Sequence, residues 1–309
     1  MPDVKPLRYP DFICIGAQKG GTTWLDHMLR QHPDIWLPPT KEVHYFNRVL
    51  ERKTAASKDE ATKIDAARMQ SILLSMRRVL NSGRGLAERI AEIYCLSLIG
   101  TPEPTDETYG RIFQTAPKNM LCGEITPNYA RLPDESVQHM IRLQPNLKVI
   151  FVLRDPIERD WSHLRMQDQR GELQQFTHAE RLLKAALRGY SDYMTTIDCY
   201  RRHVPAANFL ILFFDDIATQ PGRLLADLCA FLGLDYGGRA FSSIDEPIHA
   251  GQPKPMPPDL YEALQKHLAP VYRRLLSLDS PIVQKWYDKH YGSRESRSAA
   301  SPDAIRVSG

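Results

Sequence analysis

The stretch FICIGAQKGGTTWL, residues 12 to 25, decides the fold. Its apolar start has no polar alternation, which predicts a buried strand over residues 11–16 of the kind found in parallel sheets. A glycine-rich turn follows, and the pattern after it predicts a helix from Thr22 to Gln31. Such a strand–turn–helix unit directs backbone N–H groups and a helix N-terminus toward a negative group. The stretch therefore predicts a phosphate-binding loop.

The loop differs from the one that binds nucleoside triphosphates, G-x-x-x-x-G-K-[ST]. When Gly16 and Gly21 are aligned with its two glycines, Thr22 stands where the lysine belongs and Thr23 supplies the hydroxyl. The lysine of this chain, Lys19, lies three residues earlier. That displacement weakens an ATPase or GTPase interpretation. Taken alone, the stretch is also consistent with a simple turn before a helix capped by a threonine.

Two later segments repeat the strand-then-helix order. An apolar strand ends at Leu153 and Pro156 begins a helix, and another apolar strand near residue 208 precedes a turn and a helix. This alternation predicts an α/β fold, a P-loop-like central parallel sheet with helices on both faces. Ligands bind at the carboxyl ends of such strands. We therefore expect Lys19, Glu124, Arg154 and Asp215 along one rim of the sheet.

Composition limits the function classes. The chain has 309 residues, 42% hydrophobic and 25% charged, with a net charge of +3. It has no Lys/Arg block of the length that nucleic-acid binding needs, and no apolar run near the ~20 residues of a membrane span. The five cysteines show no C-x-x-C spacing, so we expect neither disulfides nor a metal site. No secretory signal is visible, which favours a cytoplasmic location.

The segment VIFVLRDPIERDWSHL ends a strand with Arg154 and places Ser162 eight residues on, about two helical turns away. A guanidinium and a hydroxyl arranged in this way can hold one phosphate. The alternative is that Arg154 pairs with Asp155 or Asp160 at a solvated helix start, and that Ser162 has no binding role. The segment alone does not separate the two.

Together these residues resemble the sulfotransferases that use 3′-phosphoadenosine 5′-phosphosulfate (PAPS), in particular their heparan-sulfate and bacterial branch. GAQKGGTTWL is similar to the family's 5′-phosphosulfate loop, and FVLRDPIERDWSHL to its 3′-phosphate segment. HPDIWLPPTKEVHYFN resembles the K-E-x-H-[FY]-F stretch of that branch, and GEITPNYA its G-E-x-[ST]-P-x-Y turn. The resemblance covers residues 11 to 290. It implies one sulfotransferase domain over 1–290, with a helical insertion at 51–118 near the acceptor side. The polar composition of 291–309 predicts a disordered tail.

The resemblance also implies roles for individual residues. Lys19 would contact the transferring sulfonate and the leaving phosphate oxygen. Glu42 would be the general base that takes a proton from an acceptor hydroxyl or amine, and His44 a supporting residue or an alternative base. We expect burial beside His44 to raise the pKa of Glu42 toward neutrality. The donor-binding residues implied are Lys19, Gly20, Gly21, Thr22, Thr23, Trp24, Arg154 and Ser162.

The implied reaction is transfer of a sulfonate from PAPS to a small-molecule or carbohydrate acceptor, without a metal. Two departures from the branch concern the acceptor and the cofactor. Ile125 stands where the branch usually has lysine, and only Lys254 lies near the position of its C-terminal cofactor loop. Glu42 paired with Lys41 as an ordinary loop charge remains open. So do a P-loop kinase with Asp155 as a Mg²⁺ ligand, and a nucleotide-binding scaffold without catalysis.

Overall fold

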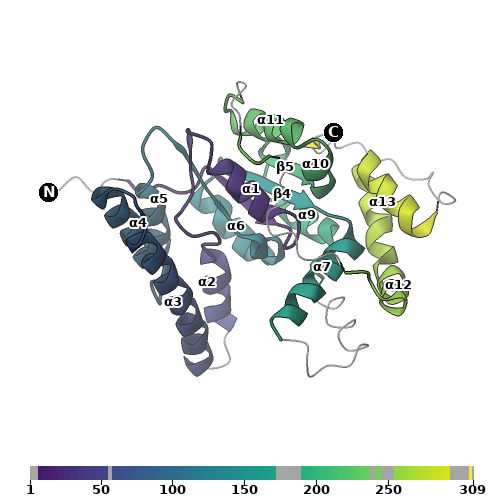
Figure 1. The fold of residues 1–309 in the computed structure, drawn as a ribbon, viewed down its shortest axis with the longest axis horizontal. Coiled ribbons are helices and arrows are strands. Elements are labelled where there is room, and N and C mark those ends of the chain that lie inside the picture. The colour runs from purple at the N-terminus through teal and green to yellow at the C-terminus, as the bar shows by residue number, and fades with distance from the viewer. Residues whose placement is uncertain are drawn as a thin grey trace. The chain divides into compact units, whose positions relative to one another are not determined.

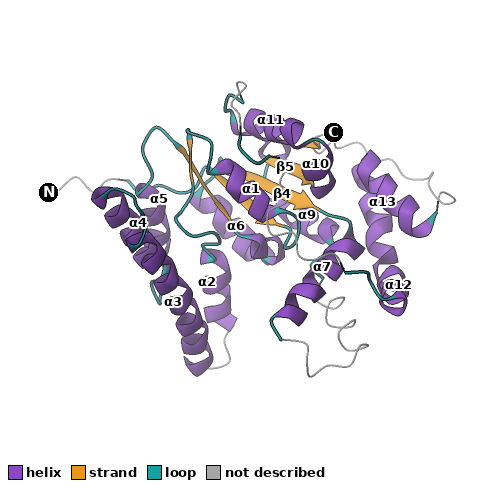
Figure 2. Cartoon of the chain, viewed as in Figure 1, coloured by secondary structure: helices purple, strands orange, loops and turns teal. Residues whose placement is uncertain are grey.

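The computed structural model describes residues 6–54, 58–171, 189–236, 241–244, 254–292 and 306–307. The chain, whose elements are labelled in Figure 1, divides into two compact units according to its internal contacts. The first comprises Met1–Ile15 and Asp26–Val149, and the second comprises Gly16–Leu25 and Ile150–Gly309. The fold is α/β with a parallel sheet flanked by helices (Figure 2), which confirms the predicted fold class.

The strands of the first unit are β1 (Phe12–Gly16), β2 (Ile35–Trp36) and β3 (Leu121–Ile125), in the order β2-β3-β1. Both pairings are parallel. All five residues of β1 are buried, as its unbroken apolar sequence predicts. Phe12 lies opposite Gly123 of β3, where any side chain would collide with the Phe12 ring. The glycine of GEITP therefore makes room for the Phe12 ring.

The first unit is helical over most of the described part of residues 51–118, where helical structure was expected. α3 and α4 pack against each other, and α4 also packs against α5 (Figure 1). Thr105 caps α5 in a reciprocal capping box with Thr108, which satisfies two backbone N–H groups at the helix start. The helices are α2 (Tyr45–Thr54), α3 (Lys58–Leu80), α4 (Leu86–Ile99), α5 (Asp106–Gln114), the 3₁₀ turn η1 (Pro127–Arg131) and α6 (Asp134–Leu143).

The second unit is built on β4 (Lys148–Leu153), β5 (Phe209–Phe213) and β6 (Arg306–Val307), in the order β4-β5-β6. The first two residues of β4 are counted in the first unit. The helices are α1 (Thr22–Leu29), which begins in this unit, α7 (Pro156–Gln169), α9 (Tyr193–Arg201), α10 (Phe214–Thr219), α11 (Pro221–Leu232), α12 (Pro258–Leu275) and α13 (Pro281–Tyr291), with 3₁₀ turns η2 (Ala206–Asn208) and η3 (Leu276–Leu278).

Three details differ from the sequence predictions. α1 ends at Leu29 rather than Gln31. A short helix, α10, stands where a turn was expected after β5, because the chain continues directly from Phe213 into helical backbone. Residues 306 and 307 form β6 beside β5, within the segment for which a disordered tail was expected. The remainder of that tail beyond residue 292 lies outside the described residues.

Candidate active site

The glycine loop after β1 is held close to β4 in the second unit. The Ala17 N–H donates to the Val152 carbonyl at 2.8 Å, and the Gly20 N–H donates to the Ala17 carbonyl at 2.9 Å. A Cβ at Gly20 would stand 2.8 Å from the Val152 oxygen, which is too close for any real side chain. At Gly21 the backbone is left-handed, with φ at +91°, and a Cβ would meet Ile217 at 2.5 Å. The loop conformation therefore requires both glycines.

α1 begins directly after this loop at Thr22, so the N–H groups of its first turn lie at the loop. Lys19 also has left-handed backbone, with φ at +68°. This conformation is uncommon for a residue with a side chain and is often found at functional sites. The Lys19 ammonium lies 3.9 Å from the sulfur of Met166 on α7. The loop thus combines helix N–H groups with a lysine, as anion-binding loops do.

Arg154, at the end of β4, contacts this loop directly. Its Nη1 donates to the Lys19 carbonyl at 3.1 Å. The guanidinium also lies over the ring of Phe214, 4.2 Å from the ring centre, in a cation–π arrangement. Burial lowers the pKa of Arg154, although an arginine stays charged. The sequence analysis missed Phe214, because an aromatic residue at the end of an apolar strand gives no signal of its own.

Arg154 and Phe214 line a cavity of about 840 Å³ in the second unit. That volume lies within the range of sites for ligands of drug size. The wall combines the apolar surfaces of Phe214 and Trp286 with charged side chains of both signs. The Trp286 indole N–H donates to the Asp215 carboxylate at 3.1 Å. The predicted rim residues Arg154 and Asp215 therefore meet at one cavity.

The other donor-binding residues predicted from sequence also belong to this unit. Ser162 is buried on α7, and Thr22 is buried at the start of α1. Thr23 follows in the first turn of α1. Trp24 is buried, and its indole N–H donates to the Ile244 carbonyl at 3.1 Å. That contact gives Trp24 a packing role beneath the loop in addition to any contact with a ligand.

A buried ionic cluster surrounds Asp155, the residue after Arg154. Its Oδ1 accepts a hydrogen bond from the Ile157 N–H, and this bond caps the start of α7. The same oxygen also accepts from the Tyr272 hydroxyl. Its Oδ2 lies 2.7 Å from His290 Nε2 and 3.4 Å from the Lys289 ammonium. Burial acts to raise the pKa of Asp155, but the His290 hydrogen bond and nearby charges outweigh burial and lower it. Both carboxylate oxygens are engaged, which speaks against Asp155 as a Mg²⁺ ligand.

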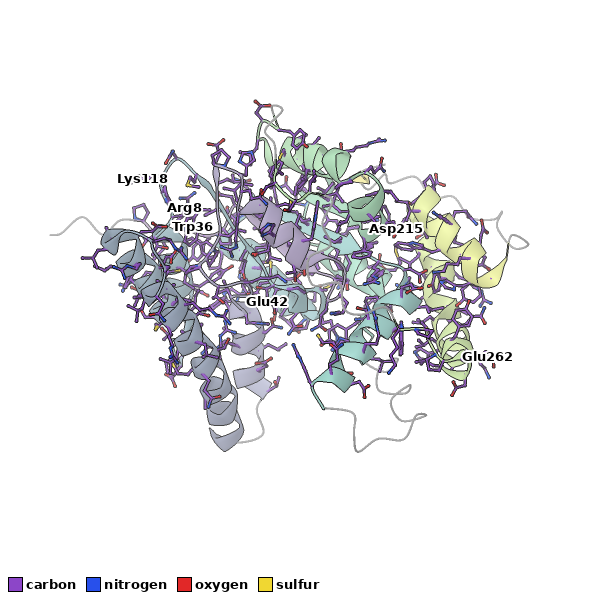
Figure 3. The ribbon with its side chains drawn as sticks, in the orientation of Figure 1. Arg8, Trp36, Glu42, Lys118, Asp215 and Glu262 are labelled. Carbon is purple, nitrogen blue, oxygen red and sulfur yellow. The ribbon has the colours of Figure 1, made fainter. Side chains whose placement is uncertain are left out.

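Glu42 and His44 belong to the first unit, in the loop before α2; Figure 3 labels Glu42. Glu42 Oε2 lies 3.0 Å from His44 Nε2, and Oε1 lies 3.5 Å from the Lys41 ammonium. Both Glu42 and His44 have left-handed backbone, with φ at +69° and +58°. Two such residues in one tight loop point to a functional constraint.

The expected rise in the pKa of Glu42 is wrong. Burial does act in that direction, but the hydrogen bond from His44 and the charge of Lys41 stabilise the carboxylate more, so the pKa is lowered. The Glu42 side chain is 36% exposed, so water also solvates its charge. The prediction named His44 correctly as a neighbour of Glu42 but overestimated how far the surroundings exclude water.

Arg68 of α3 holds this loop from the first unit's helical segment. Its Nη2 donates to the Glu42 carbonyl at 3.2 Å and also to the Val43 carbonyl. Burial and the nearby Arg48 lower the pKa of Arg68. The sequence analysis missed this contact, because 26 residues separate Arg68 from Glu42 and the helical pattern of α3 only marks Arg68 as one basic residue among several. α3 is therefore hydrogen-bonded to the main chain of the loop that carries Glu42.

Glu124 is fully buried on β3 and hydrogen-bonded by hydroxyl groups. The Tyr109 hydroxyl donates to it at 2.5 Å, Thr126 at 2.7 Å and Tyr129 at 3.4 Å. Burial raises its pKa, and these hydrogen bonds only partly offset the effect. Ile125, the residue that replaces the branch's lysine, is buried. Glu124 thus lies in the first unit's core rather than at an open rim.

Within the described residues, no group of three or more His, Cys, Asp or Glu side chains is placed to hold a metal ion. A search of the same residues finds no helix with the length and apolar character needed to cross a membrane.

Comparison with known proteins identifies the family. The sulfotransferase family model matches residues 10–237, and the chain therefore belongs to the sulfotransferase family. Over 161 residues it is 29% identical to the membrane-associated sulfotransferase kil1 of Dictyostelium discoideum. That alignment covers 51% of this chain and 23% of the relative, so the chain matches about a quarter of that protein's length.

Solved structures share the fold. A sulfotransferase from Alicyclobacillus acidocaldarius aligns with a TM-score of 0.61 and 24% identity, over 91% of this chain and 99% of that one. Mouse sulfotransferase SULT7A1, solved in complex with PAP, aligns with a TM-score of 0.51 and 14% identity, over 92% and 89% of the two chains. The family and the α/β fold are thereby established from independent comparisons.

Proposed function

We propose that this chain transfers a sulfonate from PAPS to a hydroxyl or amine of a small-molecule or carbohydrate acceptor. The observation that carries the proposal is the hydrogen bond between Arg154 and the main chain of Lys19. It joins the glycine loop and the strand-end arginine, the two parts that a donor with phosphates at both its 5′ and 3′ positions requires. PAP, the ligand of the mouse structure, is what remains of PAPS after the sulfonate has left.

The residues of the second unit fit such a donor. The glycines let the loop pack closely against Val152 and Ile217, and a glycine-rich loop of this kind presents backbone N–H groups to a phosphate. Lys19 adds a positive charge, and Thr22 and Thr23 add hydroxyls at the N-terminus of α1. In this proposal Arg154 and Ser162 bind the 3′-phosphate. Trp24 supports the loop through its contact with Ile244.

Sulfonate transfer places negative charge on the oxygen that links sulfonate and phosphate. Lys19 and the loop N–H groups stabilise that charge by position and electrostatics, without a metal ion. Glu42 is proposed to accept the proton of the acceptor. The lowered pKa of Glu42 keeps its carboxylate ionised at neutral pH, so it can accept a proton. It is a weaker base than a carboxylate whose pKa lies near neutrality. His44, 3.0 Å away, orients Glu42 or takes the proton itself.

The remaining predictions form part of the same proposal. We place the chain in the heparan-sulfate and bacterial branch, with one sulfotransferase domain over residues 1–290 and the 51–118 segment on the acceptor side. The position of the 51–118 segment on the acceptor side is supported by Arg68, because this residue of α3 is hydrogen-bonded to the loop that carries Glu42. We further propose that the protein acts in the cytoplasm.

The test is an acceptor screen with isotopically labelled PAPS, in which mass spectrometry detects the labelled sulfonate on the product. Hydroxylated and aminated carbohydrates, phenols and alcohols form the panel. Labelled product that depends on Lys19 supports the proposal. A chain that hydrolyses or transfers the γ-phosphate of ATP–Mg²⁺ and leaves PAPS intact would refute it.

A further inference from the structure

Large apolar side chains are exposed together on α3 and α4 of the first unit. Each is between 48% and 67% exposed. Among the described residues, the only other large apolar residue that is exposed rather than partly buried is Leu7, at 39%. The set, called here the hairpin face, comprises Leu73, Leu74 and Leu80 of α3 and Leu86, Ile90 and Tyr94 of α4.

The spacing places the exposed apolar residues of α4 on one side of that helix. Leu86, Ile90 and Tyr94 follow one another at intervals of four residues, so they line one side of α4. The opposite side of α4 carries Cys95 and Ile99 into the core. Exposed large apolar side chains gathered on two helices that pack together are uncommon on soluble monomers and point to an interaction site.

Two exposed arginines lie among the leucines of α3. Arg77 is one turn from Leu73 and from Leu80, and Arg78 is one turn from Leu74. No ion pair to Arg77 or Arg78 is found among the described residues. The hairpin face therefore combines apolar side chains with uncompensated positive charge.

The neighbouring carboxylates of α4 form ion pairs with another arginine. Glu92 pairs closely with Arg84, and Glu88 lies 3.8 Å from the same guanidinium. Among the described side chains of α3 and α4, no carboxylate remains to pair with Arg77 or Arg78. An occupant of the hairpin face must therefore bring negative charge as well as apolar surface.

We propose that the hairpin face docks on an anionic phospholipid surface. Leucine and isoleucine side chains enter the boundary between headgroups and acyl chains, while arginines extend to lipid phosphates at the same depth. A second copy of the chain fits less well. A two-fold interface would bring the same arginines from both copies, and each would lose water without gaining a counter-charge.

The experiment is sedimentation of the full chain with vesicles of phosphatidylcholine alone or mixed with phosphatidylglycerol. The wild type binds the mixed vesicles, and binding falls as salt rises. The double variant Leu86→Ser/Ile90→Ser binds at least tenfold more weakly. Arg77→Gln/Arg78→Gln weakens binding to anionic vesicles by about 10- to 30-fold, from the usual contribution of a basic residue near such a surface.

Matched controls remove a leucine or an arginine elsewhere in the same unit. Leu7→Ser and the exposed Arg142→Gln leave vesicle binding unchanged, and circular dichroism confirms that all variants are folded. Wild-type protein that ignores vesicles, or variants that bind as the wild type does, would overturn the proposal. So would a concentration-dependent dimer, seen by light scattering, that Leu86→Ser/Ile90→Ser abolishes while vesicle binding is absent.

Discussion

Replacing Asp155 with alanine tests how much the contacts of this carboxylate, which follows Arg154 in the chain, contribute to the stability of the second unit. The carboxylate caps α7 through the Ile157 N–H, and such a cap contributes about 1 kcal/mol. It also satisfies two buried groups, the Tyr272 hydroxyl and the His290 ring. Leaving each without a partner costs about 1–3 kcal/mol.

These contributions sum to a loss of about 3–7 kcal/mol in the free energy of unfolding, and this range includes the loss of about 3–5 kcal/mol that follows removal of one partner from a buried ion pair. The Lys289 contact adds little, because half of that side chain is exposed. Such a loss is a large part of the 5–15 kcal/mol that typically stabilises a domain. Asp155→Asn keeps a capping oxygen and costs less than the alanine variant.

The assay is urea unfolding of the wild type and both variants at neutral pH. Asp227→Ala on α11 is the control, and a change within about 0.5 kcal/mol is expected there. The pKa of Asp155 is lowered, so its stabilising effect is present above the ordinary aspartate value of 3.8 and is lost as the pH falls through the folded-state pKa. The difference between wild type and Asp155→Ala therefore shrinks below pH 3.8. An alanine variant within about 1 kcal/mol of wild type at pH 7 would refute this reasoning.

Four further outcomes follow from the two units. Gly20→Ala places a Cβ 2.8 Å from the Val152 oxygen, so we expect loss of nucleotide binding by calorimetry in a protein that still unfolds cooperatively. Arg154→Gln weakens adenosine 3′,5′-bisphosphate about 10- to 100-fold but leaves adenosine 5′-monophosphate unchanged, since a charged hydrogen bond to phosphate contributes about 1.5–3 kcal/mol. Glu42→Gln keeps nucleotide affinity and lowers kcat by about 10² or more, and kcat/KM of the wild type shows no acid limb from Glu42 near neutrality, because its pKa is lowered. Glu124 has a raised pKa, so the free energy of unfolding falls as pH rises above the ordinary value of 4.5, and Glu124→Gln flattens that slope in urea titrations.

The glycine loop and its sheet were accessible from sequence because their signals are local. An unbroken apolar run, two glycines and a helix start define the loop around Lys19 without any knowledge of distant residues. The strand that ends before Arg154 has the same kind of signal, with Pro156 marking the helix that follows. These features depend on backbone chemistry, which short stretches of sequence encode well.

The contacts that support the site were not accessible, because they join residues far apart in the chain. His290 reaches Asp155 across 135 positions, and Tyr272 reaches it across 117. Nothing in the sequence around His290 distinguishes it from an ordinary helical histidine. The prediction for the pKa of Glu42 was wrong for a related reason. The direction of the pKa shift depends on the balance between burial and the His44 contact. Only coordinates give that balance.

The central claim is that the loop at Lys19 and the arginine at the end of β4 form a site for an adenosine nucleotide with a 3′-phosphate. Two calorimetric titrations test this: one with adenosine 3′,5′-bisphosphate in metal-free buffer, and one with ATP in the same buffer with added Mg²⁺. The account predicts saturable binding of one bisphosphate per chain, weakened by Arg154→Gln, and much weaker binding of ATP–Mg²⁺. Binding of ATP–Mg²⁺ with no measurable binding of the bisphosphate would contradict it.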